Sequence, residues 1–290
     1  MQAAALTTSN VTLPGGARLS LRRGAGDASR RRFLLVHGLA SNARMWDGVS
    51  KALVAAGREV VAIDLRGHGL SEDTRDGHST QAAAADLAAL CGVLDWSGEC
   101  APIVVGQSWG GNVVVTLAAE HGGVAAIGCI DGGWLRLGAQ FDTFDECWRA
   151  LAPPHYDGLS WPDVRRSIAA AHRDWPIEAV EGALANLVEL PGGGVRNRLA
   201  RDHHRDILHS MWAADPREFY PRVGAPVLLM PAAAPTSARV AAAISEALRL
   251  LPKGRVSWYD GAHHDLHAQH PQRVAEDLLA LDAWAAGERA

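Results

Sequence analysis

The sequence predicts an α/β fold with a mostly parallel, doubly wound sheet and an inserted helical segment. Up to Asp131, short apolar runs alternate with longer amphipathic stretches, which is typical of strand–helix–strand units with right-handed crossovers. The runs are apolar throughout, as expected for strands that are buried on both faces of a parallel sheet. The alternation stops at Trp134 and resumes near Ala225. This indicates an insertion between two strands of one sheet.

Turn and capping signals divide the chain into elements. Residues 11–23 form a predicted hairpin, because two alternating stretches flank the Pro-Gly-Gly of residues 14–16. The predicted strands cover residues 32–36, 60–63, 102–105, 125–130, 225–230 and 255–259. The predicted helices cover residues 46–56, 80–94, 110–120, 237–250 and 271–286. Gly57 ends the first of these helices, and Ser79 or Thr80 can cap the second.

Residues 134–222 form the inserted segment. No strand is predicted there, and helices are predicted around residues 141–151, 161–173, 177–190 and 201–213. Prolines and glycines at residues 153–154, 176 and 191–194 separate these helices. We therefore predict a core domain of residues 1–133 and 223–290. Residues 134–222 are predicted to form a helical cap, or lid, over one rim of the sheet.

The composition is typical of a globular chain and indicates neither a polyanion nor a membrane as its partner. The chain has 290 residues, 48% hydrophobic and 21% charged, with a net charge of −4. This mildly acidic balance argues against nucleic acid and anionic membranes as partners. Residues 1–10 lack the features of a signal peptide, and no apolar run reaches the roughly 18 residues of a membrane span. We expect a cytoplasmic protein that acts on a small molecule, and homo-oligomerisation stays open.

Four polar residues stand at the carboxyl ends of predicted strands: His37, Asp64, Ser108 and Asp131. Ligands of such sheets bind at the carboxyl ends of the strands, so these side chains are expected to share one rim. The cysteines and histidines show neither C-x-x-C nor H-E-x-x-H spacing. We therefore expect neither a metal nor a cofactor.

Residues 106–110, Gly-Gln-Ser-Trp-Gly, match G-x-S-x-G between an apolar strand and a helix. On such a turn the hydroxyl of Ser108 points into a cleft, and small flanking residues let the chain pass close to itself. The N-terminus of the following helix favours a developing oxyanion. The alternative is a glycine-rich turn that holds a serine by chance.

Four motifs in this order resemble the α/β-hydrolase-fold superfamily, and in particular its serine hydrolases and esterases with a helical cap. They are His37-Gly38 with Trp46 downstream, residues 64–71 (Asp-Leu-Arg-Gly-His-Gly-Leu-Ser), the turn at Ser108, and residues 261–264 (Gly-Ala-His-His) before Pro271. The resemblance covers nearly the whole chain. It implies an α/β-hydrolase fold with Ser108 as nucleophile, although a fold alone does not fix a reaction.

The resemblance also implies a histidine base on the loop after the last strand. His263 and His264 both qualify by position. Aligning Gly261 and Pro271 with the family pattern favours His264. A shift by one residue would turn the ring away from the cleft.

The carboxylate that orients the histidine base departs in position from the usual pattern of the family. It usually follows the strand that corresponds to residues 225–230, but residues 231–236 contain no carboxylate. Some members carry the acid one strand earlier, where Asp131 stands. Asp131 is therefore the predicted orienting acid, and Asp260 and Asp265 are the alternatives. An aspartate before two glycines is also a common turn former.

The oxyanion hole and the pocket follow from position in the family pattern. The resemblance places the oxyanion hole at the backbone N–H groups of Leu39 and Trp109. As substrate-pocket residues we name Trp134, His37 and Gln107. The alternative role of His37 is to brace its own loop, and that of Trp134 is to pack the cap helices.

Together these residues predict a serine hydrolase that cleaves a carboxylic ester or lactone of a bulky, apolar small molecule. The reaction passes through an acyl-enzyme and needs no cofactor. One alternative is a lyase or cyclase that uses the same triad on a small-molecule intermediate. The other is a non-hydrolytic binding protein or sensor on the hydrolase scaffold.

Overall fold

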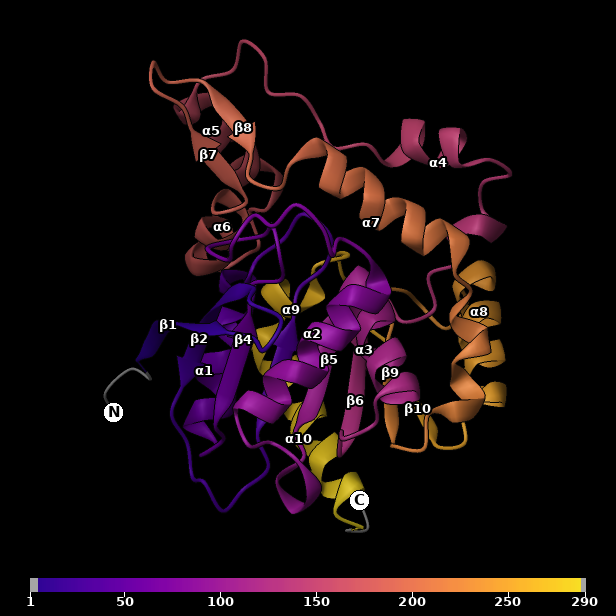
Figure 1. The fold of residues 1–290 in the computed structure, drawn as a ribbon. Coiled ribbons are helices and arrows are strands. Elements are labelled where there is room, and N and C mark those ends of the chain that lie inside the picture. Colours follow the sequence, from indigo (N-terminus) through magenta and orange to yellow (C-terminus); the bar gives the residue numbers. More distant parts are fainter. Residues whose placement is uncertain (1–4, 288–290) are drawn as a thin grey trace.

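An eight-stranded sheet forms the centre of the computed structural model, which describes residues 5–287 (Figure 1). The strand order is β1-β2-β4-β3-β5-β6-β9-β10. The strands are β1 (Leu6–Thr12), β2 (Arg18–Gly24), β3 (Phe33–Val36), β4 (Val60–Ile63), β5 (Ile103–Gln107), β6 (Ala126–Ile130), β9 (Val227–Met230) and β10 (Gly254–Val256). β2 pairs antiparallel with β1 and β4, and the other neighbouring pairs are parallel. The predicted mostly parallel sheet is confirmed.

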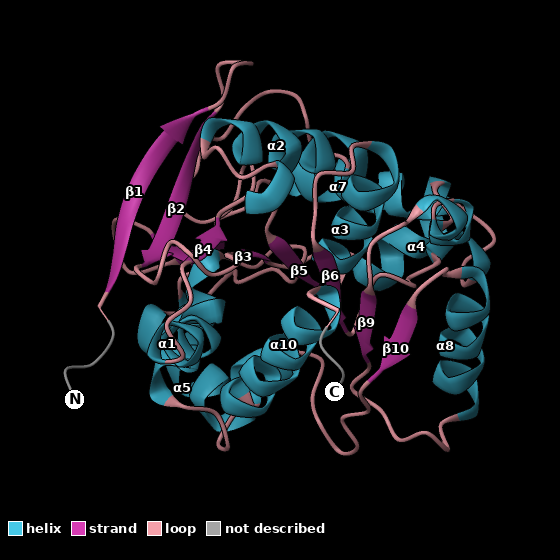
Figure 2. Cartoon of the chain, turned by 90° about the horizontal axis from the view of Figure 1, so that it is seen from below, coloured by secondary structure: helices cyan, strands magenta, loops and turns pink. Residues whose placement is uncertain are grey.

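Helices cover both faces of this sheet (Figure 2). One face carries α2 (Thr80–Val93), α3 (Trp109–Glu120) and α8 (Ala238–Leu250), and the other carries α1 (Asp47–Ala55) and α10 (Pro271–Ala285). Successive strand residues point to opposite faces, so Leu34 packs with the first group and Leu35 with the second. Both leucines are fully buried, which explains the uninterrupted apolar run of β3. The predicted doubly wound α/β-hydrolase architecture is therefore present.

The carboxyl ends of four parallel strands lie at one rim. The register pairs Val36 with Gly106, Gln107 with Ile130, and Ile130 with Met230. Because the strands end level with one another, the residues that follow them emerge side by side. This register brings the turns after β3, β5, β6 and β9 together.

The inserted segment extends beyond this rim (Figure 1). It contains α4 (Phe144–Leu151), α5 (Trp161–Ala171), α6 (Ile177–Leu184), β7 (Leu187–Glu189), β8 (Val195–Asn197) and α7 (Arg201–Ala213). The expectation of a segment without strands, and of a helix across residues 177–190, is wrong. That helix ends at Leu184, and β7 and β8 form an antiparallel hairpin. Each strand has only three residues, too few to show a period, and Gly192 and Gly193 adopt positive φ in the connecting turn.

The contacts that attach the inserted segment to the core include those of α6 and α7. Trp175 and Ala179, near and within α6, pack with Met45 and Ala268. On the other side, Ser210 of α7 accepts a hydrogen bond at 3.0 Å from the backbone N–H at the start of α2. The segment is thus joined to the core through both α6 and α7.

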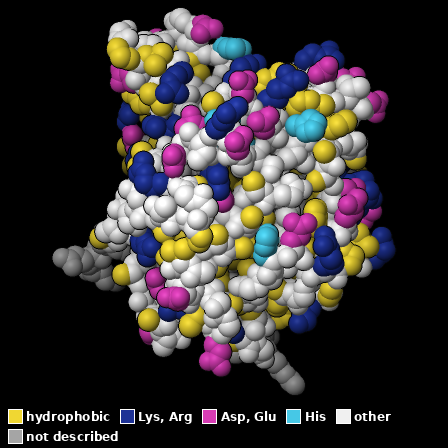
Figure 3. Space-filling view, viewed as in Figure 1, with side chains coloured by type: hydrophobic (Ala, Val, Ile, Leu, Met, Phe, Trp, Pro, Cys, Tyr) yellow, Lys and Arg dark blue, Asp and Glu magenta, His cyan; other side chains and the backbone are white. Residues whose placement is uncertain are grey.

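The surface carries charges of both signs. On the face shown in Figure 3, basic and acidic side chains are interspersed, including over the inserted segment. This agrees with the small net charge of the chain, −4. Within residues 5–287, none of the helices combines the length and the apolar character that crossing a bilayer requires.

Candidate active site

Ser108 occupies a strained turn between β5 and α3. Its φ is 53° and its ψ is −121°, a conformation that side-chain-bearing residues rarely adopt. A Cβ added to Gly106 would lie 2.0 Å from the carbonyl O of Gly110, and one added to Gly132 would lie 2.0 Å from that of Ser108. The small residues of the motif are therefore required by contact. The turn leaves the serine partly exposed at the rim.

His264 pairs with Asp131 across the rim. Nδ1 of His264 lies 2.6 Å from Oδ2 of Asp131. A carboxylate only accepts, so Nδ1 carries the hydrogen and the Nε2 of neutral His264 keeps a lone pair. The adjacent His263 is exposed, and its backbone N–H donates to Gln269 at 2.8 Å. The structure therefore brings His264, and not His263, onto the carboxylate.

Both oxygens of Asp131 are held. Oδ2 binds His264, and Oδ1 accepts the backbone N–H of Ala232 at 3.1 Å. Asp131 itself has a φ of 40°, which turns its side chain into the rim directly after β6. Of the three carboxylates considered from the sequence, Asp131, Asp260 and Asp265, the first is the one bonded to the ring.

The environment of His264 favours its charged form. Burial lowers the pKa of His264, but the hydrogen bond to Asp131 and the charges of Asp131 and Asp265 outweigh burial and raise it above the ordinary 6.5. For Asp265, burial is the main influence and raises the carboxyl pKa. The imidazolium that forms when His264 takes a proton is thus stabilised in place.

The two predicted oxyanion-hole amides lie on turns that meet at Ser108. A Cβ added to Gly38 would lie 3.0 Å from the Cβ of Ser108, so the loop carrying Leu39 contacts the serine. Trp109 is the first residue of α3, where a backbone N–H has no intrahelical acceptor. Within the described part of the chain, neither the Leu39 nor the Trp109 amide donates a hydrogen bond.

His37 braces this loop. It is fully buried, its Nδ1 donates to the carbonyl of Gly38 at 2.7 Å, and its Nε2 accepts the N–H of Leu65 at 3.0 Å. Burial lowers the pKa of His37 and keeps the ring neutral. With both nitrogens bonded to backbone, His37 is unavailable to a substrate. The structure corrects its assignment to the pocket and supports the bracing role.

The other two predicted pocket residues, Gln107 and Trp134, differ in their surroundings. Gln107 is 2% exposed, and its Nε2 donates to the carbonyl of His264 at 3.2 Å, so it braces the histidine loop instead of lining the pocket. Trp134 lines an open cavity of about 490 Å³. Asp131 lines the same cavity, together with Arg136 and Arg239. Trp134 and the predicted acid, Asp131, therefore line one cavity.

Sequence reasoning missed the residues that hold the turn after β6. Oδ1 of Asn112 accepts the N–H of Gly133 at 2.9 Å, and its Nδ2 donates to the carbonyl of Leu135 at 2.9 Å. The hydroxyl of Tyr220 donates to the carbonyl of Gly133 at 2.8 Å. The signal in the sequence that could have indicated them is Asn112, a polar residue within the otherwise apolar start of α3. These contacts fix the exit of β6 and so the direction of Asp131.

The fold and this arrangement of serine, histidine and carboxylate define an α/β-hydrolase. The chain belongs to the alpha/beta hydrolase family, whose family model matches residues 33–277.

Among curated proteins, the chain is similar to a non-heme chloroperoxidase of Streptomyces lividans, with 27% identity over 265 residues (84% of this chain and 89% of the relative). It is also similar to the pimeloyl-[acyl-carrier protein] methyl ester esterase of Neisseria meningitidis serogroup B, with 26% identity over 221 residues (72% and 76%). Among solved structures, E-2-(acetamidomethylene)succinate hydrolase superposes with a TM-score of 0.77 at 21% identity, covering 96% of this chain and 99% of the other.

Proposed function

We propose that this protein is a serine hydrolase that cleaves a carboxylic ester or lactone of a bulky, apolar small molecule. The observation that carries the proposal is the 2.6 Å contact between His264 and Asp131 at the rim where Ser108 emerges. A serine hydroxyl is a weak nucleophile unless a base stands beside it. This pair supplies a base that is already oriented.

In the first half-reaction, Oγ of Ser108 attacks the carbonyl carbon while Nε2 of His264 takes the hydroxyl proton. Asp131 stabilises the resulting imidazolium. The N–H groups of Leu39 and Trp109 stabilise the negative oxygen of the tetrahedral intermediate. His264 then gives the proton to the leaving alkoxide, and the ester C–O bond breaks, leaving an acyl group on Ser108.

In the second half-reaction, water takes the place of the alcohol. His264 removes one proton from the water as its oxygen attacks the acyl carbonyl. Collapse of the second tetrahedral intermediate returns that proton to the oxygen of Ser108 and releases a carboxylic acid. A lactone follows the same steps, except that the leaving alcohol stays attached to the acyl group.

The cavity beside Asp131 supports a bulky, apolar substrate group. Trp134, Leu135, Val240 and Ala243 line it, and such surfaces bind apolar groups by excluding water. We assign the inserted segment, residues 134–222, as a cap over this cavity. The relative named as a methyl ester esterase supports an ester as the scissile group.

The names of several relatives favour a second candidate. The Streptomyces lividans protein is a non-heme chloroperoxidase, and its match covers 84% of this chain. If hydrogen peroxide replaced water in the second half-reaction, the acyl group would leave Ser108 as a peroxy acid. That product could oxidise a halide ion and return to the carboxylic acid. The same triad would serve both outcomes.

A fluorophosphonate tests the activated serine directly. We expect the wild type to carry one adduct, on Ser108, by mass spectrometry, and Ser108→Ala to carry none. Asp131→Asn should slow labelling strongly, and the exposed Ser97→Ala should leave it unchanged. Absence of an adduct on accessible Ser108 would overturn the proposal.

A substrate panel then separates the candidate activities. We expect ester or lactone turnover that Ser108→Ala abolishes. Halide oxidation that needs both peroxide and a carboxylic acid would support the second candidate. Activity that survives Ser108→Ala but not His264→Ala would instead indicate a lyase or cyclase. Tight small-molecule binding without turnover would indicate a binding protein.

A further inference from the structure

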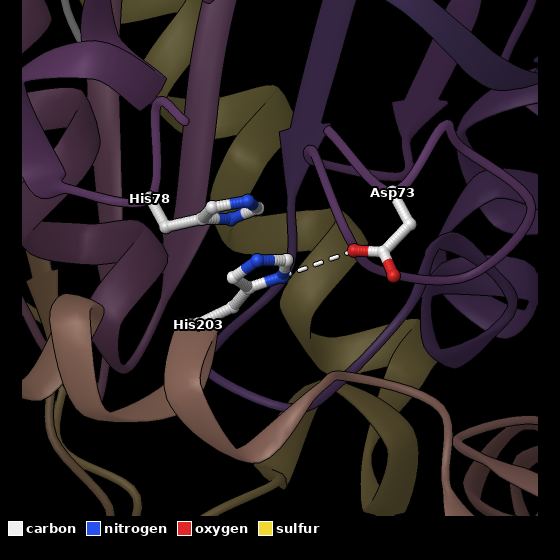
Figure 4. A group of neighbouring side chains, drawn as sticks. All are labelled: Asp73, His78 and His203. Atoms are coloured by element: carbon white, nitrogen blue, oxygen red, sulfur yellow. Dashed lines mark ion pairs between the residues drawn. The ribbon is translucent and has the colours of Figure 1, made fainter. Parts of the chain in front are cut away.

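Asp73, His78 and His203 gather where the core meets the inserted segment (Figure 4). Asp73 and His78 lie on the loop between β4 and α2, and His203 lies in the first turn of α7. One potential ligand atom of each lies within 4.8 Å of the other two. Nδ1 of His203 is 3.0 Å from Oδ1 of Asp73. None of the three belongs to the proposed triad or to its oxyanion hole.

The ring of His78 is held in the state that a metal ligand needs. Its Nε2 lies 2.7 Å from the carbonyl oxygen of Thr74, which can only accept, so Nε2 carries the hydrogen. Residue His78 is 6% exposed, and within the described residues its buried Nδ1 has no hydrogen-bond partner. With its hydrogen on Nε2, the ring keeps an unused lone pair on Nδ1.

The two rings stack beside the carboxylate of Asp73. The rings of His78 and His203 stack at 3.6 Å between centroids with an interplanar angle of 11°. For both nitrogen lone pairs to meet at one ion, His203 has to turn out of the stack about its side-chain torsions. The carboxylate of Asp73 is exposed and free to follow.

We propose that Asp73, His78 and His203 bind a divalent transition-metal ion, for which Zn²⁺ is the best match. Two neutral imidazoles and one carboxylate are ligands that Zn²⁺ accepts in tetrahedral sites, with water in the fourth position. Ca²⁺ and Mg²⁺ prefer oxygen ligands alone. A histidine whose second nitrogen donates to a backbone carbonyl is also the usual arrangement around a bound metal.

The position of the site indicates a structural role. Its ligands come from a core loop and from α7, so a bound ion would fasten the inserted segment to the core. Two residues after His78, Oγ1 of Thr80 accepts the Nε1–H of Trp109 at 3.1 Å and lies 3.0 Å from Oγ of Ser210. The same junction thus joins α7, α2 and the residue after the proposed nucleophile. This inference does not depend on the hydrolase reaction.

The test begins with treatment of this 290-residue chain with a chelator. Calorimetry then measures Zn²⁺ binding, and thermal unfolding measures Tm with and without Zn²⁺. We expect one Zn²⁺ per chain and a rise in Tm of about 5 °C at a Zn²⁺ concentration near 100 times Kd. His203→Ala and Asp73→Asn should each weaken binding by more than the about 10- to 100-fold that loss of a supporting group causes. Asp73 is exposed, so its variant should fold normally.

Two controls decide whether the binding is at this site. His209→Ala removes an exposed histidine from the same helix and should leave Zn²⁺ affinity unchanged. His264→Ala, which removes the proposed catalytic base, should also leave it unchanged. Co²⁺ bound to the wild type should show the intense visible absorption of a tetrahedral site. Equal affinity in wild type and His203→Ala, or loss of binding in either control, would overturn the proposal.

Discussion

The backbone N–H of Ala232 donates a hydrogen bond to Oδ1 of Asp131 at 3.1 Å. Ala232 lies just after β9, on the loop where the family usually carries the acid of its triad. In this chain the loop supplies a donor to a carboxylate that stands one strand earlier. Because the other oxygen of Asp131 binds His264, this carboxylate is held at both oxygens.

Asp131→Asn tests the role of this acid. The amide keeps the size of the side chain but removes the charge that orients His264 and stabilises its imidazolium, so we expect kcat to fall about 10³- to 10⁴-fold. Steady-state kinetics on an activated ester measure the loss, and circular dichroism checks the fold. Asp260→Asn is the matched control. A larger loss in Asp265→Asn than in Asp131→Asn would assign the acid to Asp265.

Much of the core could be predicted from sequence because its physical causes are local. Apolar runs such as residues 33–36 lie between turns, and a parallel sheet buries both faces of such runs. The rim followed from the same pattern, since polar residues stand directly after the strands. The hairpin of β7 and β8 could not be predicted, because strands of three residues are too short to show a period.

The finer contacts of the rim depend on distance in space and not in sequence. Gln107 is a polar residue beside the proposed nucleophile, and only the fold shows that its amide donates to the carbonyl of His264. His37 likewise bonds to the backbone of Leu65. The group of Asp73, His78 and His203 escaped motif searching, because α7 brings His203 to a loop far earlier in the chain. Spacing motifs detect ligands that lie at short, regular separations in the sequence.

The pH dependence of catalysis should report His264. The base must be neutral, so kcat/KM should rise with pH and level off above the pKa of this histidine. Burial opposes the charged ring, but the hydrogen bond and charge of Asp131 prevail and set the pKa above 6.5. In Asp131→Asn the midpoint should move to lower pH. A midpoint that is the same in both proteins would show that Asp131 does not govern the base.

Two glycine-to-alanine substitutions test whether close backbone contact, and not the loss of glycine as such, makes a position sensitive to change. In Gly132→Ala the new Cβ would lie 2.0 Å from the carbonyl O of Ser108, so the turn must distort. We expect a loss of about 3 kcal/mol in stability and most of the activity. In Gly92→Ala the new Cβ, near the end of α2, meets no atom within 4 Å. That change should stabilise the protein by about 0.5–1 kcal/mol. Urea unfolding measures both, and similar destabilisation by the two would contradict the contact argument.

Trp134→Ala tests the assigned pocket. Loss of the indole should lower kcat/KM by about 10-fold for esters with a bulky apolar group and much less for acetyl esters, whose acyl group is small. Trp148→Ala is the control, because Trp148 packs under the guanidinium of Arg201 within the inserted segment and does not line the cavity. Equal losses for both substrate classes would place the pocket elsewhere.

Buried histidines should lower the stability of the fold at acidic pH, and His267 is the clearest example. It is fully buried beside Trp46, with ring centroids 4.4 Å apart, and within the described residues neither of its nitrogens has a hydrogen-bond partner. Burial is the main influence, and it lowers the pKa of His267 to about 3. In the unfolded chain the ring takes up a proton near its ordinary pKa of 6.5.

The direction of the effect follows from proton binding. Below pH 6.5, His267 binds a proton in the unfolded state but stays neutral in the folded state. The contribution of His267 to the free energy of unfolding therefore falls by about 1.4 kcal/mol for each pH unit. The stabilisation is fully present above pH 6.5, and about 2 kcal/mol of it is lost by pH 5. In His267→Leu this loss disappears, and the variant should gain stability relative to wild type at pH 5 but not at pH 8. Urea unfolding between these values measures the difference, and parallel pH profiles for the two proteins would show that His267 is charged in the fold.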